Sequence, residues 1–519
     1  MSAKKSVKNN NNHPVVLVIL DGFGISKRKQ GNAVLNAHMP VFKDLWKKYP
    51  HTELKADGSS VGLPKGEAGN SEAGHQTIGA GRIVESDKVI IDKTIANKSF
   101  FQNQAFQKAA DHVKKNNSTL HLMGLLTNSQ SAHASMNHVF ALIKQAQKLK
   151  IKKVNLHLFT DGRDTPPYHA LKLLVELERQ LPKQYRIASV CGRFYAMDRN
   201  RNWKRTELAY NAIVLGMGAI AQDATEAIES AYERGESDEY IIPTIIPKNS
   251  HSPHIHDNDA VIFWNLRSDR ARQLCKPFIQ KDFEKRNKKT FKRDKILKNL
   301  LFVTLTEFGK QIDGAIAAYP HHEITETIVE ALRSKKQIYI AESEKYAHVT
   351  YFFNGGFDDP RFGEKRIRIP SYHVNSFADV PQMRAMEIKD EVVKSVKKGY
   401  DFICANIANP DMVAHTGSYK ATVKACEFTD KVIKGIWREV SKKKGTLIII
   451  ADHGNAEEVF AKNGEIDTHH NANPVPCIIA RPGIGKKKIR SGSLADIAPT
   501  VLKIMHMEVP KVMSGKSLL

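Results

Sequence analysis

Aspartate and histidine residues gather in short segments near both ends of the chain, and several of these segments follow an apolar run. The residues concerned are Asp21, Asp411, His415, Asp452, His453, His469 and His470. Asp411 and His415 stand four residues apart, so on a helix they share one face. Carboxylates and imidazoles together suit Mn²⁺, Zn²⁺ or Fe²⁺ better than Ca²⁺ or Mg²⁺. So many groups exceed the needs of one ion, and they predict a centre with two metal ions.

Each of these segments also has a simpler interpretation when it is taken alone. An aspartate directly after a strand is often the N-cap of a helix. An Asp and a His four residues apart are often a surface pair, and Asp-His-Gly is common in turns. The occurrence of all three patterns in one chain favours the metal centre.

A single serine, Ser71, lies in the glycine-rich stretch GEAGNSEAGHQTIGAGR, residues 66–82. Glycine lets other groups approach the backbone closely. A serine hydroxyl is a weak nucleophile unless a base or a metal ion activates it. The residues after Ser71 can begin a helix, whose N-terminus favours the charge of a phosphate. These features predict a nucleophilic serine, while a simple N-cap at Ser71 stays compatible with them.

The middle of the chain places arginines, together with a histidine and an aspartate, after other apolar runs. They are His133, Arg163, Asp164, Arg193, Arg199, Arg267 and Arg270. Arginine binds phosphate and carboxylate through two parallel hydrogen bonds. Any one of these arginines is typical of a surface ion pair, but five at comparable positions predict a pocket for a small, multiply charged anion.

The elements that must position these residues are short runs rich in Val, Ile and Leu, which predict buried strands. The runs are 15–20, 120–125, 154–159, 187–190, 261–263, 301–305, 338–341, 402–405 and 447–450. Helical patterns such as 169–180 and 420–440 separate many of them. This alternation predicts an α/β fold with mostly parallel sheets covered on both faces. Ligands of such sheets bind at the carboxyl ends of the strands, where the polar residues above are found.

Length and composition set further bounds. A chain of 519 residues is expected to form two or three domains. No apolar run is long enough to span a membrane, and we expect no membrane partner. Residues 1–13 are polar and predict a disordered tail. The five cysteines are scattered and predict free thiols in a reducing cytoplasm.

The chain is strongly basic, with 79 Lys and Arg against 55 Asp and Glu, a net charge of +24. The densest basic stretch, residues 281–298, predicts a solvated helix or connector. A nucleic-acid-binding protein is one alternative, but the sequence lacks zinc-finger spacing and RNP-type aromatic motifs. We therefore expect no nucleic-acid partner and relate part of the charge to capture of an anionic substrate.

Several long motifs occur together and in order from about Pro14 to the C-terminus. They are VVLVILDGFG, GEAGNSEAGHQTIGAGR, DGRDTPP, GRFYAMDRN, AESEKYAHVTYFFNGG, NPDMVAHTG and ADHGNAEE. These motifs closely resemble those of the cofactor-independent (2,3-bisphosphoglycerate-independent) phosphoglycerate mutases, which belong to the alkaline phosphatase superfamily. The resemblance implies a phosphatase-like dimetal domain made of residues 14–85 and 316–519. A phosphotransferase and substrate-binding domain is then inserted at about 86–315, each domain with a mostly parallel sheet flanked by helices.

The resemblance also implies a role for each candidate residue. Ser71 is expected to carry the phosphoryl group, and two Mn²⁺ ions are expected as cofactors. One ion would be bound by Asp21, Ser71, Asp452 and His453, and the other by Asp411, His415 and one histidine of the 469–470 pair. Alignment on Asn473 favours His470 and leaves His469 possible. The substrate contacts implied are His133, Arg163, Asp164, Arg193, Arg199, Arg267, Arg270 and Lys345.

The activity implied is the interconversion of 3-phosphoglycerate and 2-phosphoglycerate in glycolysis and gluconeogenesis through a phosphoserine. Asp164 is the expected acid or base for the glycerate hydroxyls, and the family suggests a cytoplasmic monomer. A dimetal phosphomonoesterase or another phosphomutase of the same superfamily is the nearest alternative. The inserted arginine-rich segment argues against a plain phosphatase.

Overall fold

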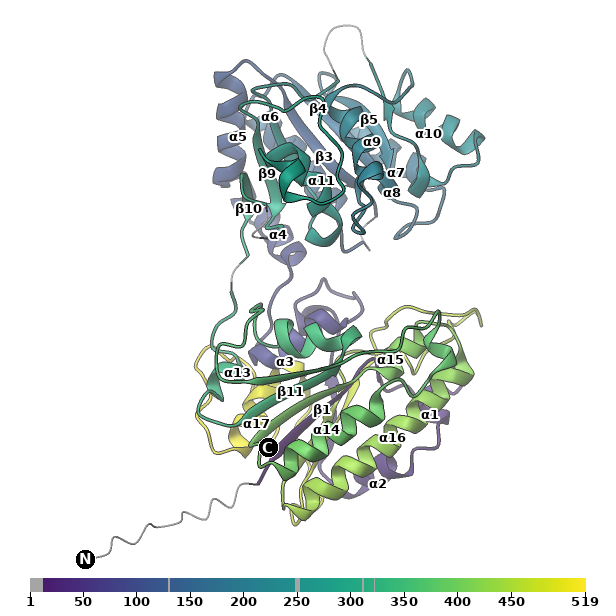
Figure 1. Cartoon of the computed structure of the whole chain (residues 1–519), viewed down its shortest axis with the longest axis vertical. Helices are drawn as coiled ribbons and strands as arrows, with labels where there is room; N and C mark the ends of the chain where they lie inside the picture. Colours follow the sequence, from purple (N-terminus) through teal and green to yellow (C-terminus); the bar gives the residue numbers. More distant parts are fainter. Residues whose placement is uncertain (1–12, 129–130, 248–252, 310–311, 322) are drawn as a thin grey trace, which may run out of the picture. The chain divides into compact units, whose positions relative to one another are not determined.

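The computed structural model describes residues 13–128, 131–247, 253–309, 312–321 and 323–519. The predicted tail therefore lies outside the described residues except for His13. The chain divides into two compact units (Figure 1). Unit 1 comprises Met1–Ser86 and Glu323–Leu519, and unit 2 comprises Asp87–His322.

Unit 1 is built on an eight-stranded sheet with the order β12-β11-β13-β1-β14-β15-β2-β16. The strands are β1 (Val15–Leu20), β2 (His51–Lys55), β11 (Gln337–Glu342), β12 (Lys365–Ile369), β13 (Phe402–Ile407), β14 (Thr446–Ile450), β15 (Val475–Ala480) and β16 (Gly492–Ser493). β1 pairs in parallel with β13 and β14, whereas β15 is antiparallel to both of its neighbours. Every residue of β1 is buried, as a strand covered on both faces requires.

Helices cover this sheet, and α14 and α16 pack side by side along it (Figure 1). The α-helices of unit 1 are α1 (Ala33–Asn36), α2 (Pro40–Lys48), α3 (Ser71–Ala80), α13 (Ile328–Ala331), α14 (Ala385–Lys397), α15 (Asn409–Ala414), α16 (Tyr419–Lys442) and α17 (Ile497–Ile504). Short helical turns are η1 (Gly58–Val61), η4 (Ser343–Lys345), η5 (His348–Phe352), η6 (Phe377–Asp379) and η7 (Leu494–Asp496). The apolar face of α16 buries residues such as Val432, Ile433 and Ile436 in the core of the unit.

Unit 2 contains a second eight-stranded sheet with the order β10-β9-β8-β3-β4-β5-β7-β6. Its strands are β3 (Leu120–Leu126), β4 (Val154–Thr160), β5 (Arg186–Gly192), β6 (Ala219–Ile220), β7 (Thr244–Ile245), β8 (Ala260–Phe263), β9 (Leu301–Thr306) and β10 (Ala315–Tyr319). Its helices are α4 (Asp87–Ala96), α5 (Gln104–Lys115), α6 (Met136–Lys148), α7 (Ala170–Gln180), α8 (Arg193–Ala196), α9 (Trp203–Val214), α10 (Ala224–Glu233), α11 (Ser268–Ile279) and α12 (Phe283–Arg286), with turns η2 (Ser99–Gln102) and η3 (Asp238–Tyr240). All pairs except β5 with β7 are parallel.

The sequence prediction of an α/β fold with two mostly parallel sheets is confirmed. All nine apolar runs form strands, and the two helical patterns form α7 and α16. The inserted unit continues past the expected boundary at residue 315, because β10 pairs with β9 and the unit ends at His322. Among the described residues, no helix has the length and apolar character needed to cross a membrane. The five cysteines are free and buried.

The basic stretch 281–298 is less solvated than its composition predicts. It contains the short helix α12, and the side chain of Arg293 within it is only 1% exposed. The Arg293 guanidinium donates hydrogen bonds to the carbonyl oxygens of Pro277 and Gln280 and pairs with Glu284 at 2.9 Å. Burial is possible because carbonyl and carboxylate oxygens satisfy the guanidinium.

Candidate active site

Three adjacent strands of unit 1 bring three aspartates to one edge of the sheet. β1 lies between β13 and β14, and all three run in parallel. Asp21 follows β1 directly, Asp411 lies in the first turn of α15 after β13, and Asp452 follows β14. All three aspartates are fully buried. The carboxyl edge of the sheet therefore presents three carboxylates in a space from which water is largely excluded.

Ser71 reaches the same place from the start of α3. Asn70 is the N-cap of this helix, because its side chain accepts a hydrogen bond from the Ala73 N–H at 2.9 Å. Ser71 is therefore the first helical residue, and the simple N-cap interpretation is wrong. The missing side chain of Gly74 lets α3 approach the strand end, since a Cβ there would lie 2.6 Å from the Asp452 carbonyl oxygen.

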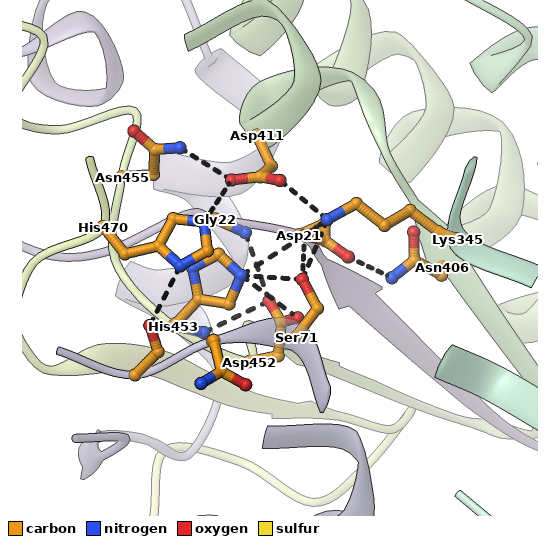
Figure 2. Close-up of polar contacts among 12 residues, drawn as sticks. Asp21, Gly22, Ser71, Lys345, Asn406, Asp411, Asp452, His453, Asn455 and His470 are labelled. Carbon is orange, nitrogen blue, oxygen red and sulfur yellow. Dashed lines mark hydrogen bonds and ion pairs between the residues drawn. The ribbon is translucent and has the colours of Figure 1, made fainter. Parts of the chain in front are cut away.

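The Ser71 hydroxyl lies within hydrogen-bond distance of three groups (Figure 2). The Lys345 Nζ donates to Ser71 Oγ at 2.8 Å, and His453 Nε2 lies 2.9 Å from the same oxygen. Ser71 Oγ lies 3.2 Å from Asp21 Oδ1. Lys345 Nζ also contacts Asp21 Oδ1 and Asp411 Oδ2, each at 2.6 Å. The predicted substrate contact Lys345 thus lies among the candidate metal ligands.

Two groups of side chains have the composition and spacing to hold metal ions. One consists of Asp411, His453 and His470, and the other of Asp21, His75 and Asp452. Within each group the ligand atoms lie within 4.8 Å of one another. The structure therefore brings together the predicted residues of both ends of the chain and adds His75, which the sequence analysis did not select.

His75 lies behind the second group and makes contacts on both sides of its ring. Its Nδ1 is 2.9 Å from the Ser71 carbonyl oxygen and 3.2 Å from Asp452 Oδ2. Its Nε2 faces the side-chain amide of Asn406, which also donates to Asp21 Oδ2 at 2.6 Å. The signal in the sequence was its position four residues after Ser71, one helical turn further along α3.

The three histidines that the sequence analysis offered as partners of Asp411, which are His415, His469 and His470, differ clearly in position. His470 Nε2 lies 3.4 Å from Asp411 Oδ1 and 3.0 Å from His415 Nε2. His415 Nε2 is itself 3.3 Å from the same Asp411 oxygen. In contrast, the side chain of His469 is 88% exposed and contacts Asp467. Geometry therefore favours His470 over His469 as the ligand.

The charges of this cluster hold its carboxylates ionised. Burial opposes ionisation of Asp21 and Asp411, but the Lys345 ammonium and the neighbouring histidines together outweigh burial and hold the pKa of both carboxyl groups below its usual range. The same carboxylates raise the pKa of Lys345 against the effect of burial. Burial lowers and Asp452 raises the pKa of His453, with a net rise to about 9. A buried cluster of ionised carboxylates is a strong attractor for cations.

The predicted anion-binding residues gather at the carboxyl edge of the second sheet, in unit 2. Arg193 lies 2.5 Å from Asp161 Oδ1 and 3.2 Å from Asp164 Oδ1. The Ser131 hydroxyl donates to Asp164 Oδ2 at 2.6 Å. Burial raises the pKa of Asp164, but the Ser131 hydroxyl and the Arg193 guanidinium, with His133, outweigh burial and leave this pKa below its usual value. Asp164 is therefore an ionised carboxylate held in a fixed position.

One carboxylate, Asp269, connects the other members of this set. It pairs with Arg199 at 3.0 Å, with Arg267 at 3.6 Å and with His133 Nδ1 at 4.0 Å. Burial lowers the pKa of Arg270, and the charges of neighbouring arginines lower it further. The guanidinium groups are thus close enough to repel one another, which creates a site with excess positive charge.

The side chain of Arg163 is 53% exposed, and its guanidinium lies 3.7 Å from a carboxylate oxygen of Glu239. Sequence reasoning also missed Asp161 and Asp269 in this unit. Both lie in segments that carry predicted arginines. Asp161 lies two residues before Arg163 in DGRD, and Asp269 lies two residues after Arg267 in RSDR. Their role as internal partners of the arginines becomes visible only in the fold.

Comparison with known proteins gives consistent results along the whole chain. Residues 91–310 match the family model described as BPG-independent PGAM N-terminus. The 2,3-bisphosphoglycerate-independent phosphoglycerate mutase of Clostridium perfringens is 45% identical over 514 residues, covering 98% of this chain and 99% of that protein. The protein of the same name from Clostridium novyi is 45% identical over 513 residues. The crystal structure of Leishmania mexicana phosphoglycerate mutase at low cobalt concentration aligns with a TM-score of 0.76 at 28% identity, covering 98% of each chain.

Proposed function

Because the chain belongs to the family of 2,3-bisphosphoglycerate-independent phosphoglycerate mutases, we propose that it interconverts 3-phosphoglycerate and 2-phosphoglycerate through a phosphoserine at Ser71. The observation that supports this proposal most directly is the environment of Ser71 Oγ. That oxygen lies within 3.2 Å of a lysine ammonium, a histidine nitrogen and a carboxylate. The ammonium stabilises negative charge on this oxygen, and the carboxylate can accept its proton.

The donor set fits two divalent transition-metal ions. Its buried carboxylates and imidazoles are the ligands that Mn²⁺ accepts. In the described part of the chain, the buried oxygen Asp452 Oδ2 of the second group makes no hydrogen bond, although His75 Nδ1 lies 3.2 Å from it. We assign Asp21, Ser71, Asp452 and His453 to one ion and Asp411, His415 and His470 to the other. When bound, such ions neutralise phosphate charge and stabilise an alkoxide.

The protein's own residues prepare Ser71 for attack. The Lys345 ammonium favours the alkoxide over the hydroxyl, because it stabilises negative charge on Ser71 Oγ. The oxygen then attacks phosphorus in line, the Oγ–P bond forms, and the bond from phosphorus to the glycerate oxygen breaks. In the return step the other glycerate hydroxyl attacks the phosphoserine and regenerates the Ser71 alkoxide. Phosphate is thus moved between two oxygens of one molecule without net hydrolysis.

The residues of unit 2 are suited to bind the glycerate part of the substrate. Arg267 and Arg270 supply bidentate donors for the carboxylate, together with Arg163, Arg193, Arg199 and His133. Asp164 is ionised and fixed by Ser131 and Arg193. We assign the ionised Asp164 the removal of the proton from the free glycerate hydroxyl and the delivery of that same proton to the glycerate oxygen from which the phosphoryl group departs.

The decisive experiment follows the phosphoryl group. Ser71→Ala should abolish mutase activity, because the hydroxyl that contacts Lys345, His453 and Asp21 is that of Ser71. Mass spectrometry of the wild-type protein quenched with 3-phosphoglycerate should find phosphate on the peptide that contains Ser71. Isomerisation is measured beside release of free phosphate, without added bisphosphoglycerate and with or without EDTA. Appreciable isomerisation by the Ser71→Ala protein, or faster phosphate release than isomerisation by the wild type, contradicts the proposal.

Three finer parts of the proposal come from the family resemblance and have their own tests. Mn²⁺ is the proposed ion, so Mn²⁺ should restore activity to the EDTA-treated protein better than Zn²⁺ or Mg²⁺. The protein is proposed to act as a monomer, which sedimentation velocity would measure. The cytoplasm is the proposed location, which fractionation of the source cells would test.

A further inference from the structure

One buried carboxylate next to the candidate metal centre belongs to none of its ligand groups. The side chain of Glu457 is 1% exposed and lies five residues after Asp452. Its Oε2 accepts hydrogen bonds from two backbone N–H groups, those of Gly24 at 2.8 Å and Asn455 at 2.9 Å. Its Oε1 accepts one from the side-chain amide of Asn473 at 3.0 Å. The mechanism proposed above makes no use of this group.

The three donors come from three different segments, and each segment carries a proposed metal ligand. Gly24 lies three residues after Asp21, and Asn455 lies two residues after His453. Asn473 lies three residues after His470. A single carboxylate therefore fixes the backbone or side-chain position of all three segments close to their ligands.

Two glycines leave the room that this carboxylate occupies. A Cβ on Gly24 would lie 2.2 Å from Glu457 Oε1, and a Cβ on Gly454 would lie 2.4 Å from the same oxygen. No substituted carbon fits at such distances, so both backbones can approach the carboxylate only as glycine. The close approach explains why Gly24 of the DGFG motif and Gly454 of the DHGN motif are glycines. The proposed chemistry by itself does not require glycine at either position.

We propose that Glu457 is a positioning residue that sets the separation of Asp21, His453 and His470 and thereby tunes metal affinity. Carboxylates that orient the ligands of a metal from behind typically change affinity by about 10–100-fold when they are removed. Glu457 touches none of the reacting atoms and no assigned ligand atom. Its effect is expected on metal binding rather than on the transfer step once metal is bound.

The fold itself has other links between the same segments. Backbone hydrogen bonds join Ala456 N to the Gly22 carbonyl at 2.9 Å and Ile25 N to the Pro474 carbonyl at 2.7 Å. Removal of the Glu457 side chain therefore leaves the segments connected by these backbone hydrogen bonds, but the three segments lose their shared hydrogen-bond acceptor. We expect a folded protein with a looser centre.

The test compares Glu457→Ala with Asp430→Ala in the full chain. Asp430 is a matched control, because it is a buried carboxylate of the same unit that accepts two backbone N–H groups, from Val41 and Phe42. Mn²⁺ is titrated by calorimetry into each EDTA-treated and dialysed protein, and thermal unfolding is recorded without metal. Glu457→Ala should weaken Mn²⁺ binding by about 10–100-fold, whereas Asp430→Ala should lower the unfolding temperature with Mn²⁺ affinity within about threefold of the wild type. Equal loss of affinity in both variants, or wild-type affinity in Glu457→Ala, overturns the proposal.

A second variant keeps the proposal testable if Glu457→Ala does not fold. Gly24→Ala should also weaken Mn²⁺ binding, because its Cβ displaces the Glu457 carboxylate. If the two residues act through this contact, Glu457→Ala combined with Gly24→Ala should bind Mn²⁺ no more weakly than Glu457→Ala alone. Additive losses overturn the assignment, as does wild-type affinity in Gly24→Ala.

This inference rests on the proposed metal centre, and the two can fail separately. If the wild-type protein binds no Mn²⁺ in the titration, the metal centre is wrong. If the wild type binds Mn²⁺ and Glu457→Ala binds it equally well, only the positioning role is wrong.

Discussion

The two clusters of charged residues in this protein differ in burial and in the way their charges are balanced. In unit 1, Asp21, Asp411 and Asp452 are fully buried, and the Lys345 ammonium is placed among them. In unit 2, the side chains of Arg163 and Arg199 are 53% and 51% exposed. Buried charges must be paired at short distances, whereas exposed charges can exchange partners with solvent. The first cluster is therefore suited to chemistry and the second to reversible capture of an anion.

The excess charges of the two clusters are opposite in sign. Carboxylates dominate around Ser71 and attract cations, while arginines dominate around Asp269 and attract anions. Asp269 pairs with Arg199 and Arg267, and Arg267 is one of the two arginines that we propose bind the substrate carboxylate. The comparison leads us to expect that substitutions around Ser71 in unit 1 change turnover, and that substitutions of the exposed arginines in unit 2 change substrate affinity.

Among the substitutions that compare the two clusters, the largest effect is expected for Lys345→Ala. Loss of the ammonium removes the donor closest to Ser71 Oγ and leaves Asp21 and Asp411 without their shared partner. We expect kcat to fall by about 10²–10³-fold, as when one preorganised donor is removed from other active sites. Steady-state kinetics at saturating Mn²⁺ measure this, with Lys345→Arg as the variant that keeps the charge. If Lys345→Ala instead changed only KM and left kcat unchanged, the expected difference between the two clusters would be contradicted.

A smaller effect, and one on a different constant, is expected for Arg267→Ala. A hydrogen bond between charged groups contributes about 1.5–3 kcal/mol, which corresponds to a rise in KM of roughly 10–100-fold. Arg267 belongs to unit 2 and Ser71 to unit 1. Because Arg267 is proposed to bind the glycerate part and not the reacting oxygen, kcat should change much less than KM. The exposed Arg179 on α7 provides the control, and Arg179→Ala should leave both constants within about twofold. Equal falls in kcat for Lys345→Ala and Arg267→Ala would contradict the comparison.

The smallest effect concerns the pH dependence of stability and His133. Burial and the nearby Arg193 lower the pKa of His133 from 6.5 to about 4. Above pH 6.5 the imidazole is neutral in both the folded and the unfolded protein, so it does not change the free energy of unfolding there. As the pH falls from 6.5 to 4 the unfolded chain binds the proton and the folded protein does not, which lowers the free energy of unfolding by on the order of 2 kcal/mol.

This prediction is measured as a difference between wild type and His133→Gln. Thermal unfolding of both proteins in EDTA is recorded from pH 7 to pH 4.5, so that metal release is the same for each. The wild type should lose stability relative to His133→Gln as the pH falls. A constant difference between the two proteins over this range would show that His133 is not held neutral by its surroundings.

Much of this molecule follows from local sequence. Runs such as Val15–Leu20 and Thr446–Ile450 form strands because their aliphatic side chains must be buried on both faces of a sheet. The order of strands and helices along the chain then makes parallel sheets, and parallel sheets gather the residues that follow them at one edge. The membership of the Asp, His and Ser cluster was therefore accessible from the sequence.

Other features depend on contacts between segments that are remote in the chain, and only the tertiary structure decided them. Lys345 was assigned to the substrate, yet its ammonium lies between Asp21 and Asp411, because η4 follows a strand two positions away from β1 in the sheet. In the sequence Glu457 is not distinguished by its type or its spacing, and His75 is marked only by its position four residues after Ser71. Their partners become known only when the sheet is assembled. The sequence likewise predicts that Arg293 is solvated, whereas in the structure its guanidinium donates to buried carbonyl oxygens. The local sequence pattern determines which helix or strand a residue belongs to. The charge state and the role of its side chain depend on the groups that the fold packs against it.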